Sequence, residues 1–223
     1  MSFYDIYNLI VMMLYGDTTP PTSTINFLQG STGLIWRVYN RIIRDYNFWF
    51  MRAYTTWDTT AGIQTYGLPD LFKEIISIQF KKEGESYFID PLIPLRLEDP
   101  FLTQWNENQD QVEYPEYYEL VENNITIYPP PKYARTLHLI YWTFFSAPSS
   151  SDWVQSTSTS NSLTENAGDI IAYLAASEYS LIMKEYDQSK MYNLKGQELL
   201  AELKKLDYRK RQAPVSTILY EAF

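Results

Sequence analysis

The sequence predicts an α+β fold, in which a helical bundle built from both ends of the chain accompanies a central antiparallel β-domain. Three observations support this class. Near both ends, apolar residues recur every three or four positions, which is the period of an amphipathic helix. Between them, β-branched and aromatic runs are broken by turn residues, as in antiparallel strands. A Ser/Thr-rich stretch with neither period, 147–162, is predicted to be a loop.

The helical domain is predicted to combine residues 1–48 and 163–212. Ser2 caps a first helix over 3–15, which ends at Gly16 and the prolines that follow. A second helical region begins near position 22 and becomes strongly periodic from position 34 to position 46, so that its apolar side chains share one face.

Three arginines, Arg37, Arg41 and Arg44, share another face of this second helical region. Such a stripe could meet a phosphate group. A solvated face, or salt bridges between subunits, is the more ordinary role of basic residues at helical spacing.

Residues 49–146 are predicted to form the β-domain. Alternation over 74–82 places Ile76, Ile78 and Phe80 on one side of a strand. The most apolar strand, 137–145, is expected to be central or well covered. The other predicted elements are a hairpin of 49–57 with 63–68, a helical turn at 69–72, a strand at 86–89 that pairs with 74–82, one or two helical turns within 95–105, and a hairpin of 114–121 with 125–128.

The C-terminal part of the helical domain is predicted to hold two helices. Thr164 is the expected N-cap of the first, whose apolar face extends through Leu181 and Ile182 to about Tyr186. A turn at 187–189 leads into a last helix that ends near Arg211. Its inward side chains are predicted to be Leu199, Leu200, Leu203 and Leu206.

Composition excludes several classes of function. The net charge of −9 argues against sequence-specific DNA binding, because an acidic chain gains nothing from counterion release at phosphates. Without cysteine there is no disulfide framework and no thiolate metal site, and no metal or cofactor is expected. The apolar stretch 6–14 is too short to span a bilayer and does not resemble a signal peptide, so we expect a cytoplasmic origin and no membrane partner.

Aromatic residues are unusually frequent, with 20 Tyr, 11 Phe and 6 Trp against a single His. Tyr and Trp combine a large rigid contact area with a polar group, and are enriched at protein interfaces. His138 lies within an apolar strand and is expected to be packed rather than catalytic. No phosphate-binding loop, nucleophile elbow or metalloprotease motif occurs, so no catalytic residue is assigned and the chain is not expected to be an enzyme.

The segment 213–223 is predicted to be a C-terminal docking arm. A proline stops the preceding helix, yet the residues after it are largely apolar, whereas free tails are ordinarily polar. Such an arm docks either on the chain's own core or in a groove of a partner, and the sequence leaves both open. The residues that define it are Pro214, Val215, Ile218, Leu219, Tyr220 and Phe223.

Four segments, taken in order, resemble the adaptor (head–tail connector) proteins of tailed bacteriophages, especially short-tailed ones. They cover roughly residues 22 to 210. The segments are the helix-to-strand passage 37–50, the hairpin-to-turn passage 59–72, the stretch 117–131 in which an Ile-Thr-Ile-Tyr-Pro strand follows a short turn, and the helix that opens Asp169-Ile-Ile-Ala-Tyr-Leu-Ala-Ala with the Leu-rich helix after it. The helix before Thr22 and the stretch 147–162 have no assigned counterpart.

The resemblance implies a structural virion protein of the head–tail junction, made in the cytoplasm of the host bacterium. It implies a homo-oligomeric ring, typically a dodecamer, between the portal protein and the tail or nozzle protein. Such a ring extends the DNA channel and lets double-stranded DNA pass without specific binding during genome ejection. The family habit of C-terminal portal contacts makes the six arm residues the expected portal-binding set. Tyr87 and Phe88, aromatic and in a hairpin of the β-domain, are the expected tail-binding residues.

Two alternatives stay open on the sequence alone. One is a glycan-binding virion module, in which aromatic strands would be sugar platforms; hydrolysis would also need a carboxylate pair ~5–10 Å apart in a cleft. The other is a different neck or tail component. Helix content speaks against a tail-tube protein, because those are mostly β and this chain has four predicted helical segments.

Overall fold

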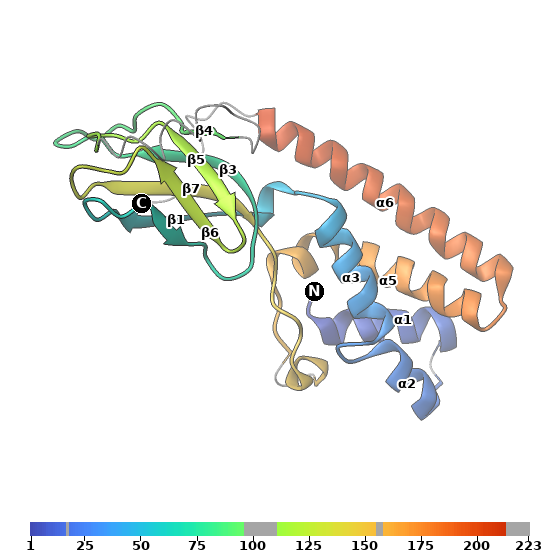
Figure 1. Cartoon of the computed structure of the whole chain (residues 1–223). Coiled ribbons are helices and arrows are strands. Elements are labelled where there is room, and N and C mark those ends of the chain that lie inside the picture. The colour runs from blue at the N-terminus through green and yellow to red at the C-terminus, as the bar shows by residue number, and fades with distance from the viewer. Residues whose placement is uncertain (17, 96–110, 155–157, 213–223) are drawn as a thin grey trace. The chain divides into compact units, whose positions relative to one another are not determined.

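The computed structural model describes residues 1–16, 18–95, 111–154 and 158–212. The chain divides into two compact units (Figure 1). The helical unit comprises Met1–Met51 with Phe144–Phe223, and the β unit comprises Arg52–Thr143. Helices lie at both ends of the chain and antiparallel sheets lie between them, so the predicted α+β class is confirmed.

The helical unit begins with a helix that its own first residues cap. Ser2 Oγ accepts a hydrogen bond from the backbone N–H of Asp5, and the Asp5 carboxylate accepts one from the Ser2 N–H at 2.8 Å, which is the reciprocal arrangement of a capping box. The predicted first helix is therefore confirmed. The N-terminal helices are α1 (Phe3–Tyr15), α2 (Thr22–Leu28) and α3 (Leu34–Asp45), followed by a 3₁₀ turn, η1 (Trp49–Met51).

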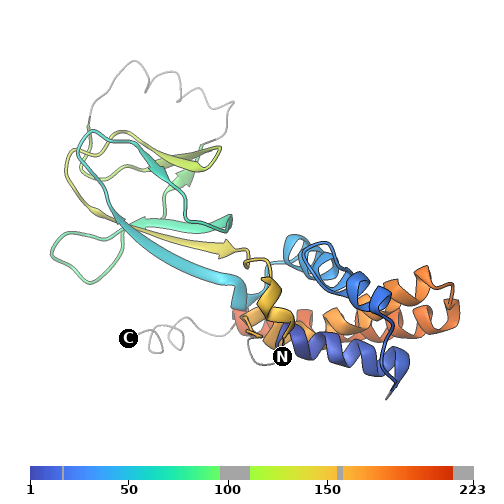
Figure 2. The same ribbon diagram turned by 90° about the horizontal axis from the view of Figure 1, so that it is seen from below.

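Helix α5 (Ser162–Ile182) is the centre of the helical unit, because α1, α3 and α6 (Tyr186–Gln212) all pack against it. Figures 1 and 2 show α5 and α6 side by side and running in opposite directions. Gly196 of α6 faces Leu174 of α5, and a Cβ atom at position 196 would lie 2.7 Å from Leu174 Cδ2. The missing side chain therefore permits the close approach of these two helices.

Three details of α5 and α6 correct the sequence predictions. The N-cap of α5 is Asn161, whose side-chain oxygen accepts hydrogen bonds from two backbone N–H groups; Thr164 lies inside the first turn, where its Oγ1 accepts a bond from the Asn161 N–H. The turn between the helices precedes Tyr186, so that 187–189 is already helical. Leu206 is 43% exposed, because the buried stripe of α6 runs through Leu200 and Leu203 at its centre.

The Ser/Thr-rich stretch contains a short 3₁₀ helix, η2 (Ser150–Trp153), whose last residue is buried and packs on Phe3 at 5.5 Å between ring centroids. Asp152 is 8% exposed, and its carboxylate accepts hydrogen bonds from the backbone and hydroxyl groups of Ser149 and Thr159. Asp152 therefore connects Ser149 to Thr159 through its carboxylate, a role that the composition of the stretch does not indicate.

The β unit consists of a three-stranded sheet and a four-stranded sheet that share one core. The strand orders are β1-β7-β3 and β2-β6-β5-β4. Buried residues of both sheets, among them Ile78, Phe80, Ile125 and Leu139, pack together. The strands are β1 (Arg52–Asp58), β2 (Thr65–Gly67), β3 (Phe72–Phe80), β4 (Ile93–Pro94), β5 (Tyr117–Val121), β6 (Asn124–Tyr128) and β7 (Thr136–Thr143).

Two predictions in this unit are confirmed. Strand β7 is the central strand of its sheet (Figure 1), and β5 pairs with β6 as a hairpin around Glu122 and Asn123. The hairpin of 49–57 with 63–68 is wrong, because β1 pairs with β7 and β2 pairs with β6 of the other sheet. Which strands pair depends on contacts between distant parts of the chain, which local alternation does not encode.

Two smaller predictions in this unit are also wrong, and a third is confirmed in part. Residues 69–72 form a turn rather than a helical turn: Leu71 has a φ of 59° and β3 starts at the next residue. Ile76 is 39% exposed, since a register shift between Ile75 and Ser77 turns it away from Ile78 and Phe80. The predicted hairpin of 86–89 with 74–82 is present as an antiparallel return, with a bridge from Lys81 to Phe88 and a hydrogen bond from the Ile89 N–H to the Phe80 carbonyl, although 86–89 forms no strand of its own. The helical turns expected within 95–105 lie, after position 95, outside the described residues.

Candidate functional site

The single histidine is packed against aromatic rings in the β unit. Its ring lies 4.9 Å from the Phe88 ring, nearly parallel to it, and 5.8 Å from the Tyr54 ring. Burial, and then the charge of Arg52, lower the pKa of His138, so its ring is neutral at pH 7. Its Nδ1 atom has no hydrogen-bond partner among the described residues. The imidazole ring of His138 therefore packs against the rings of Phe88 and Tyr54.

The described part of the chain contains neither a candidate metal site nor a candidate membrane-spanning helix. No group of three or more His, Cys, Asp or Glu side chains within it is arranged to hold a metal ion. Among the described helices, none is both long enough and apolar enough to cross a membrane.

The predicted tail-binding residues lie on a loop that follows β3. Tyr87 is 48% exposed and Phe88 is 40% exposed, so both are available to a partner. The loop returns alongside the strand, because the Ile89 N–H donates to the Phe80 carbonyl at 2.8 Å. Gly84 has a φ of 73°, a conformation that glycine adopts without strain, and it makes the sharp turn possible. We call residues 81–88 the aromatic loop.

Tyr87 is held by a neighbour in the same loop. The Lys82 ammonium group donates a hydrogen bond to the Tyr87 hydroxyl and lies 5.0 Å from the centroid of its ring. This hydrogen bond raises the pKa of Lys82. A cation beside the face and hydroxyl of an exposed tyrosine limits the rotamers that the ring samples.

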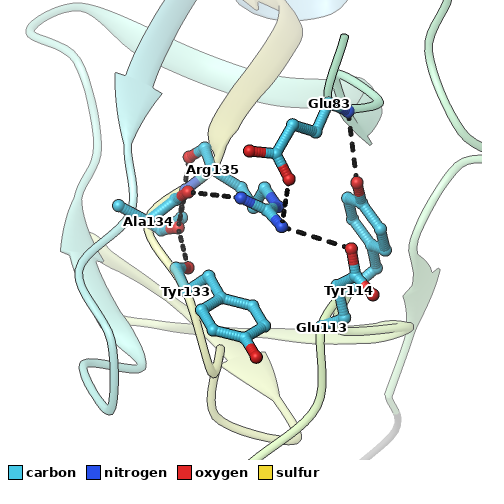
Figure 3. A network of polar contacts seen from close by, with 7 residues as sticks. Glu83, Glu113, Tyr114, Tyr133, Ala134 and Arg135 are labelled. Atoms are coloured by element: carbon cyan, nitrogen blue, oxygen red, sulfur yellow. Dashed lines mark hydrogen bonds and ion pairs between the residues drawn. The ribbon is translucent and has the colours of Figure 1, made fainter. Parts of the chain in front are cut away.

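The base of the aromatic loop is tied down by Arg135, which sits at the start of β7 (Figure 3). Its Nη2 lies 2.6 Å from Glu83 Oε2 of the loop and 3.2 Å from Glu113 Oε1. The backbone N–H of Glu83 donates to the Tyr114 hydroxyl at 3.2 Å. Three segments far apart in the sequence therefore meet at one guanidinium group.

Aromatic rings enclose this guanidinium group, so the side chain of Arg135 is only 12% exposed. Its Cζ lies 5.6 Å from the Tyr114 ring centroid and 5.2 Å from that of Tyr133. Its backbone is bonded as well: the Arg135 N–H donates to Thr59 Oγ1 and its carbonyl accepts from the Thr59 N–H. Sequence reasoning missed this anchor, because its partners come from segments that no local pattern connects.

The predicted basic stripe of α3 has a partner within its own chain. Arg41 Nη1 lies 2.6 Å from Glu178 Oε1 of α5, and Arg44 Nε lies 3.5 Å from Asp45 Oδ1. Arg41 therefore bonds to another helix of its own chain, whereas the Arg44 side chain is 75% exposed and lies on a solvated face.

A second surface was missed because it contradicts the helical pattern. Leu181 and Ile182, predicted to face inward, are 54% and 47% exposed at the end of α5. Met183 and Tyr186, at the turn into α6, are also exposed. Apolar side chains recur at helical spacing to the end of α5, but no described segment packs against the last of them, so they are exposed.

The predicted portal-binding arm, 213–223, lies outside the described residues. The structure therefore does not test the prediction for its six residues, Pro214, Val215, Ile218, Leu219, Tyr220 and Phe223.

Comparison with known families gives one match. The model of a family described as SU10 adaptor protein matches residues 1–218, which is nearly the whole chain and includes both structural units. Among curated proteins, none matches this chain.

Proposed function

This chain belongs to the SU10 adaptor protein family, and from that membership we propose that it forms a ring between the portal and the tail or nozzle of a phage virion. The membership makes it a structural adaptor protein of a phage, with a place at the neck of the virion. The observation that carries the proposal is the match over residues 1–218, since it spans both the helical unit and the β unit.

Ring formation agrees with the surface of the chain. A closed ring requires two different and complementary surfaces on each subunit, because each copy meets the next in the same way. Large hydrophobic side chains are exposed on both units: Ile63 and Ile93 on the β unit, and Ile182 and Tyr186 on the helical unit. Exposed aromatic and apolar groups of this kind mark contact surfaces.

Passage of DNA agrees with the charge. Residues 52–143 contain 14 acidic and 7 basic residues, so the β unit carries −7 of the net −9. A channel lined by negative charge repels phosphates and lets double-stranded DNA slide without binding. The finer proposal is a ring, of dodecameric symmetry as in similar proteins, that prolongs the channel of the portal.

We assign the two axial contacts to different parts of the chain. The arm 213–223 is the proposed portal contact, because it is apolar after a helix stop. The aromatic loop is the proposed tail contact, because Tyr87 and Phe88 are exposed and are held in place by Lys82 and Arg135.

The decisive experiment compares the mass and shape of the purified protein alone and mixed with the portal protein of its phage, by light scattering and negative-stain imaging. A ring, formed alone or only on the portal, is the expected result. A stable monomer that ignores the portal but binds glycans would overturn the proposal in favour of the glycan-binding alternative.

A further inference from the structure

Helix α1 is more apolar than a helix that is covered on one side only. Of its 13 residues, Asp5 and Asn8 alone are neither apolar nor aromatic. A helix that is apolar on all sides is ordinarily buried on all sides. The buried residues of α1, among them Ile6 and Ile10, lie toward the rest of the helical unit, whereas Met12 is 61% exposed. The described part of the chain therefore leaves one side of α1 uncovered.

The uncovered side of α1 is a single row of side chains. Residues spaced alternately three and four positions apart share one side of a helix. Met12 lies two residues, or about 200°, from the buried Ile10, so its row is opposite the buried one. Three members of the row are exposed and Tyr15 is half-buried. We call Asp5, Asn8, Met12 and Tyr15 the α1 row.

Helix α6 has a row of the same spacing on its outer side. Leu194 lies two residues from both Tyr192 and Gly196, which are buried, so it points away from α5. Met191 is 57% exposed and Leu194 is 61% exposed, and the other two members are exposed as well. From Met191 onward the steps are three, four and three residues, and the α1 row has the same steps. We call Met191, Leu194, Glu198 and Ala201 the α6 row.

The two rows belong to helices on opposite sides of α5 (Figure 1). Tyr179 of α5 bonds to Tyr15 of α1, whereas Ser177 of α5 bonds to Ser189 of α6. Tyr179 and Ser177 are two residues apart, which is about 200° around α5. Because each row faces away from α5, the rows lie on two opposite surfaces of the helical unit.

The rows are antiparallel and lie at the same height. Helix α1 ends beside the end of α5, since Tyr15 bonds to Tyr179, and α6 starts there and runs back along α5. The Tyr192 hydroxyl of α6 donates to the Met13 carbonyl of α1 at 2.7 Å, so these two positions are level. Counted away from this contact in opposite directions, the members of the two rows come level with each other to within about one residue, or 1.5 Å.

We propose that the α1 row of one copy packs on the α6 row of the next copy in the ring. The inference rests on the proposed ring and names the contact that closes it. A rotation about an axis that runs along these helices keeps every residue at its height, so the equal heights and equal steps bring the rows into register. The pairs are Tyr15 with Met191, Met12 with Leu194, Asn8 with Glu198, and Asp5 with Ala201.

The paired side chains fit one another chemically. Met12 and Leu194, each 61% exposed in the single chain, cover each other. The Asn8 amide forms no hydrogen bond within the described residues and can donate to Glu198 Oε1, because the Lys195 ammonium group bonds to Glu198 Oε2. The Asp5 carboxylate stays in its bonds to the first residues of the chain and meets the methyl group of Ala201.

The match between the rows favours a second copy over the portal or tail protein as the cover of α1. Two surfaces of one unit agree in spacing, direction and height, and an unrelated partner would not require this agreement. The rows differ from each other, so each copy uses one toward each neighbour. That is the head-to-tail contact that a closed ring needs.

Disulfide trapping tests the pairing, and it is specific because the chain has no native cysteine. The variant with Met12→Cys and Leu194→Cys, assembled alone or on the portal and then oxidised, should give a ladder of covalent multimers on a non-reducing gel. Its cross-linked fraction should exceed that of either single variant at least about tenfold, because only the pair brings two Cβ atoms within disulfide reach. An equimolar mixture of the single variants should give covalent dimers and nothing larger.

A second cysteine pair, Met12→Cys with Asn193→Cys, is the matched control. Asn193 is exposed and adjoins Leu194 in the chain, but it lies about 100° away around α6. This pair should cross-link no more than the single variants do.

A charge placed in the contact provides an independent test. Leu194→Glu should lower the yield of rings at least about tenfold, because its carboxylate would be buried against Met12 without a partner. Adding Met12→Lys should restore most of the yield, since an ammonium group then pairs with that carboxylate. Both positions are exposed in the single chain, so circular dichroism and Tm should show normal folding.

The outcomes separate this inference from the proposed function. Rings that form no disulfide with Met12→Cys and Leu194→Cys, or normal rings from Leu194→Glu, would overturn the inference and leave the adaptor ring standing. Cross-linking by Met12→Cys alone as strong as that of the pair would show a twofold contact and overturn it as well. A wild-type chain that forms no ring, alone or on the portal, would overturn both.

Discussion

The hydroxyl oxygens of Tyr15 and Tyr179 lie 2.7 Å apart and join the end of α1 to α5. Thr24 Oγ1 of α2 completes a triangle, 2.9 Å from the Tyr15 hydroxyl and 2.8 Å from the Tyr179 hydroxyl. Thr24 and Tyr179 are buried, so these hydroxyls satisfy one another in place of water. Three helices of the proposed adaptor are thereby held in one relative position.

Replacing Tyr179 with Phe should lower the free energy of unfolding by about 1 kcal/mol, because both hydrogen bonds of the Tyr179 hydroxyl are lost and only the bond between Tyr15 and Thr24 remains. Urea unfolding would measure the loss. Tyr173→Phe on the same helix is the matched control: no hydrogen bond of its hydroxyl occurs among the described residues, and it should change little. Equal effects of the two substitutions would contradict the prediction.

Asp152 should make the stability depend on pH. Burial of its carboxyl opposes ionisation, but the hydrogen bonds from Thr159 and Ser149 outweigh it and lower the pKa of Asp152 below its usual range. Its stabilising effect is therefore complete above the unfolded pKa, near 3.9, and is lost as the pH falls through the folded pKa.

The variant Asp152→Asn should cost about 1.5–3 kcal/mol at pH 7, because bonds to a charged acceptor are lost. The difference from wild type should shrink as the pH is lowered from about 5 to 3. Denaturant unfolding at several pH values measures both effects. The exposed Asp169→Asn is the control and should follow wild type; a difference that stays constant with pH would exclude the charge as the cause.

Alanine at Gly196 should lower stability by about 1–3 kcal/mol. The new Cβ would lie 2.7 Å and 2.9 Å from two carbon atoms of the buried Leu174 side chain, so α6 would have to move from α5. The gain in helix propensity, about 1 kcal/mol, offsets part of this cost. Gly168→Ala is the helical control, because the three atoms nearest to its Cβ all belong to the side chain of Met1, the nearest being Sδ at 2.9 Å, and the first residue of the chain can shift more easily than Leu174 in the middle of α5. Thermal unfolding should rank Gly196→Ala well below Gly168→Ala.

A chain that ends at Gln212 should keep its helical content but bind the portal protein at least about tenfold more weakly, if the arm buries its apolar side chains there. A full-length chain with Ile218→Ser, Leu219→Ser and Tyr220→Ser separates apolarity from length and should be equally impaired. Affinity measured by interferometry decides the question. Unchanged binding by the shortened chain would show that the arm does not contact the portal.

The double variant Tyr87→Ala with Phe88→Ala should abolish attachment of the tail while leaving rings intact, because it removes the exposed rings of the aromatic loop. Pull-down of the tail or nozzle protein by preformed rings would measure attachment. Tyr54→Ala removes a ring that is 66% exposed and also contacts His138, but lies outside the loop. It should have little effect. Normal attachment by the double variant would refute the assignment.

Local patterns in the sequence were sufficient where the structure is itself local. The capping box of Ser2 and Asp5 involves residues three positions apart, and the hairpin of β5 and β6 turns over adjacent residues. Capping groups and turn residues act through their immediate neighbours, so they can be recognised without knowledge of the fold. The exposed Tyr87 and Phe88 were found on the same basis, from a turn signal at Gly84 that places them in a hairpin with the strand before it.

The sequence by itself determined the α+β class, the start of the first helix and the apolar strand at the centre of its sheet. Only the tertiary structure decided that β1 pairs with β7 and β2 with β6, that Ile76 turns outward at a register shift, and that Arg135 joins Glu83 to Glu113. The physical reason is the separation along the chain of the residues that interact. Periodicity and capping depend on backbone geometry over a few residues, whereas strand partners and ion-pair anchors depend on the free energy of contacts between distant segments, which exist only once the chain has folded.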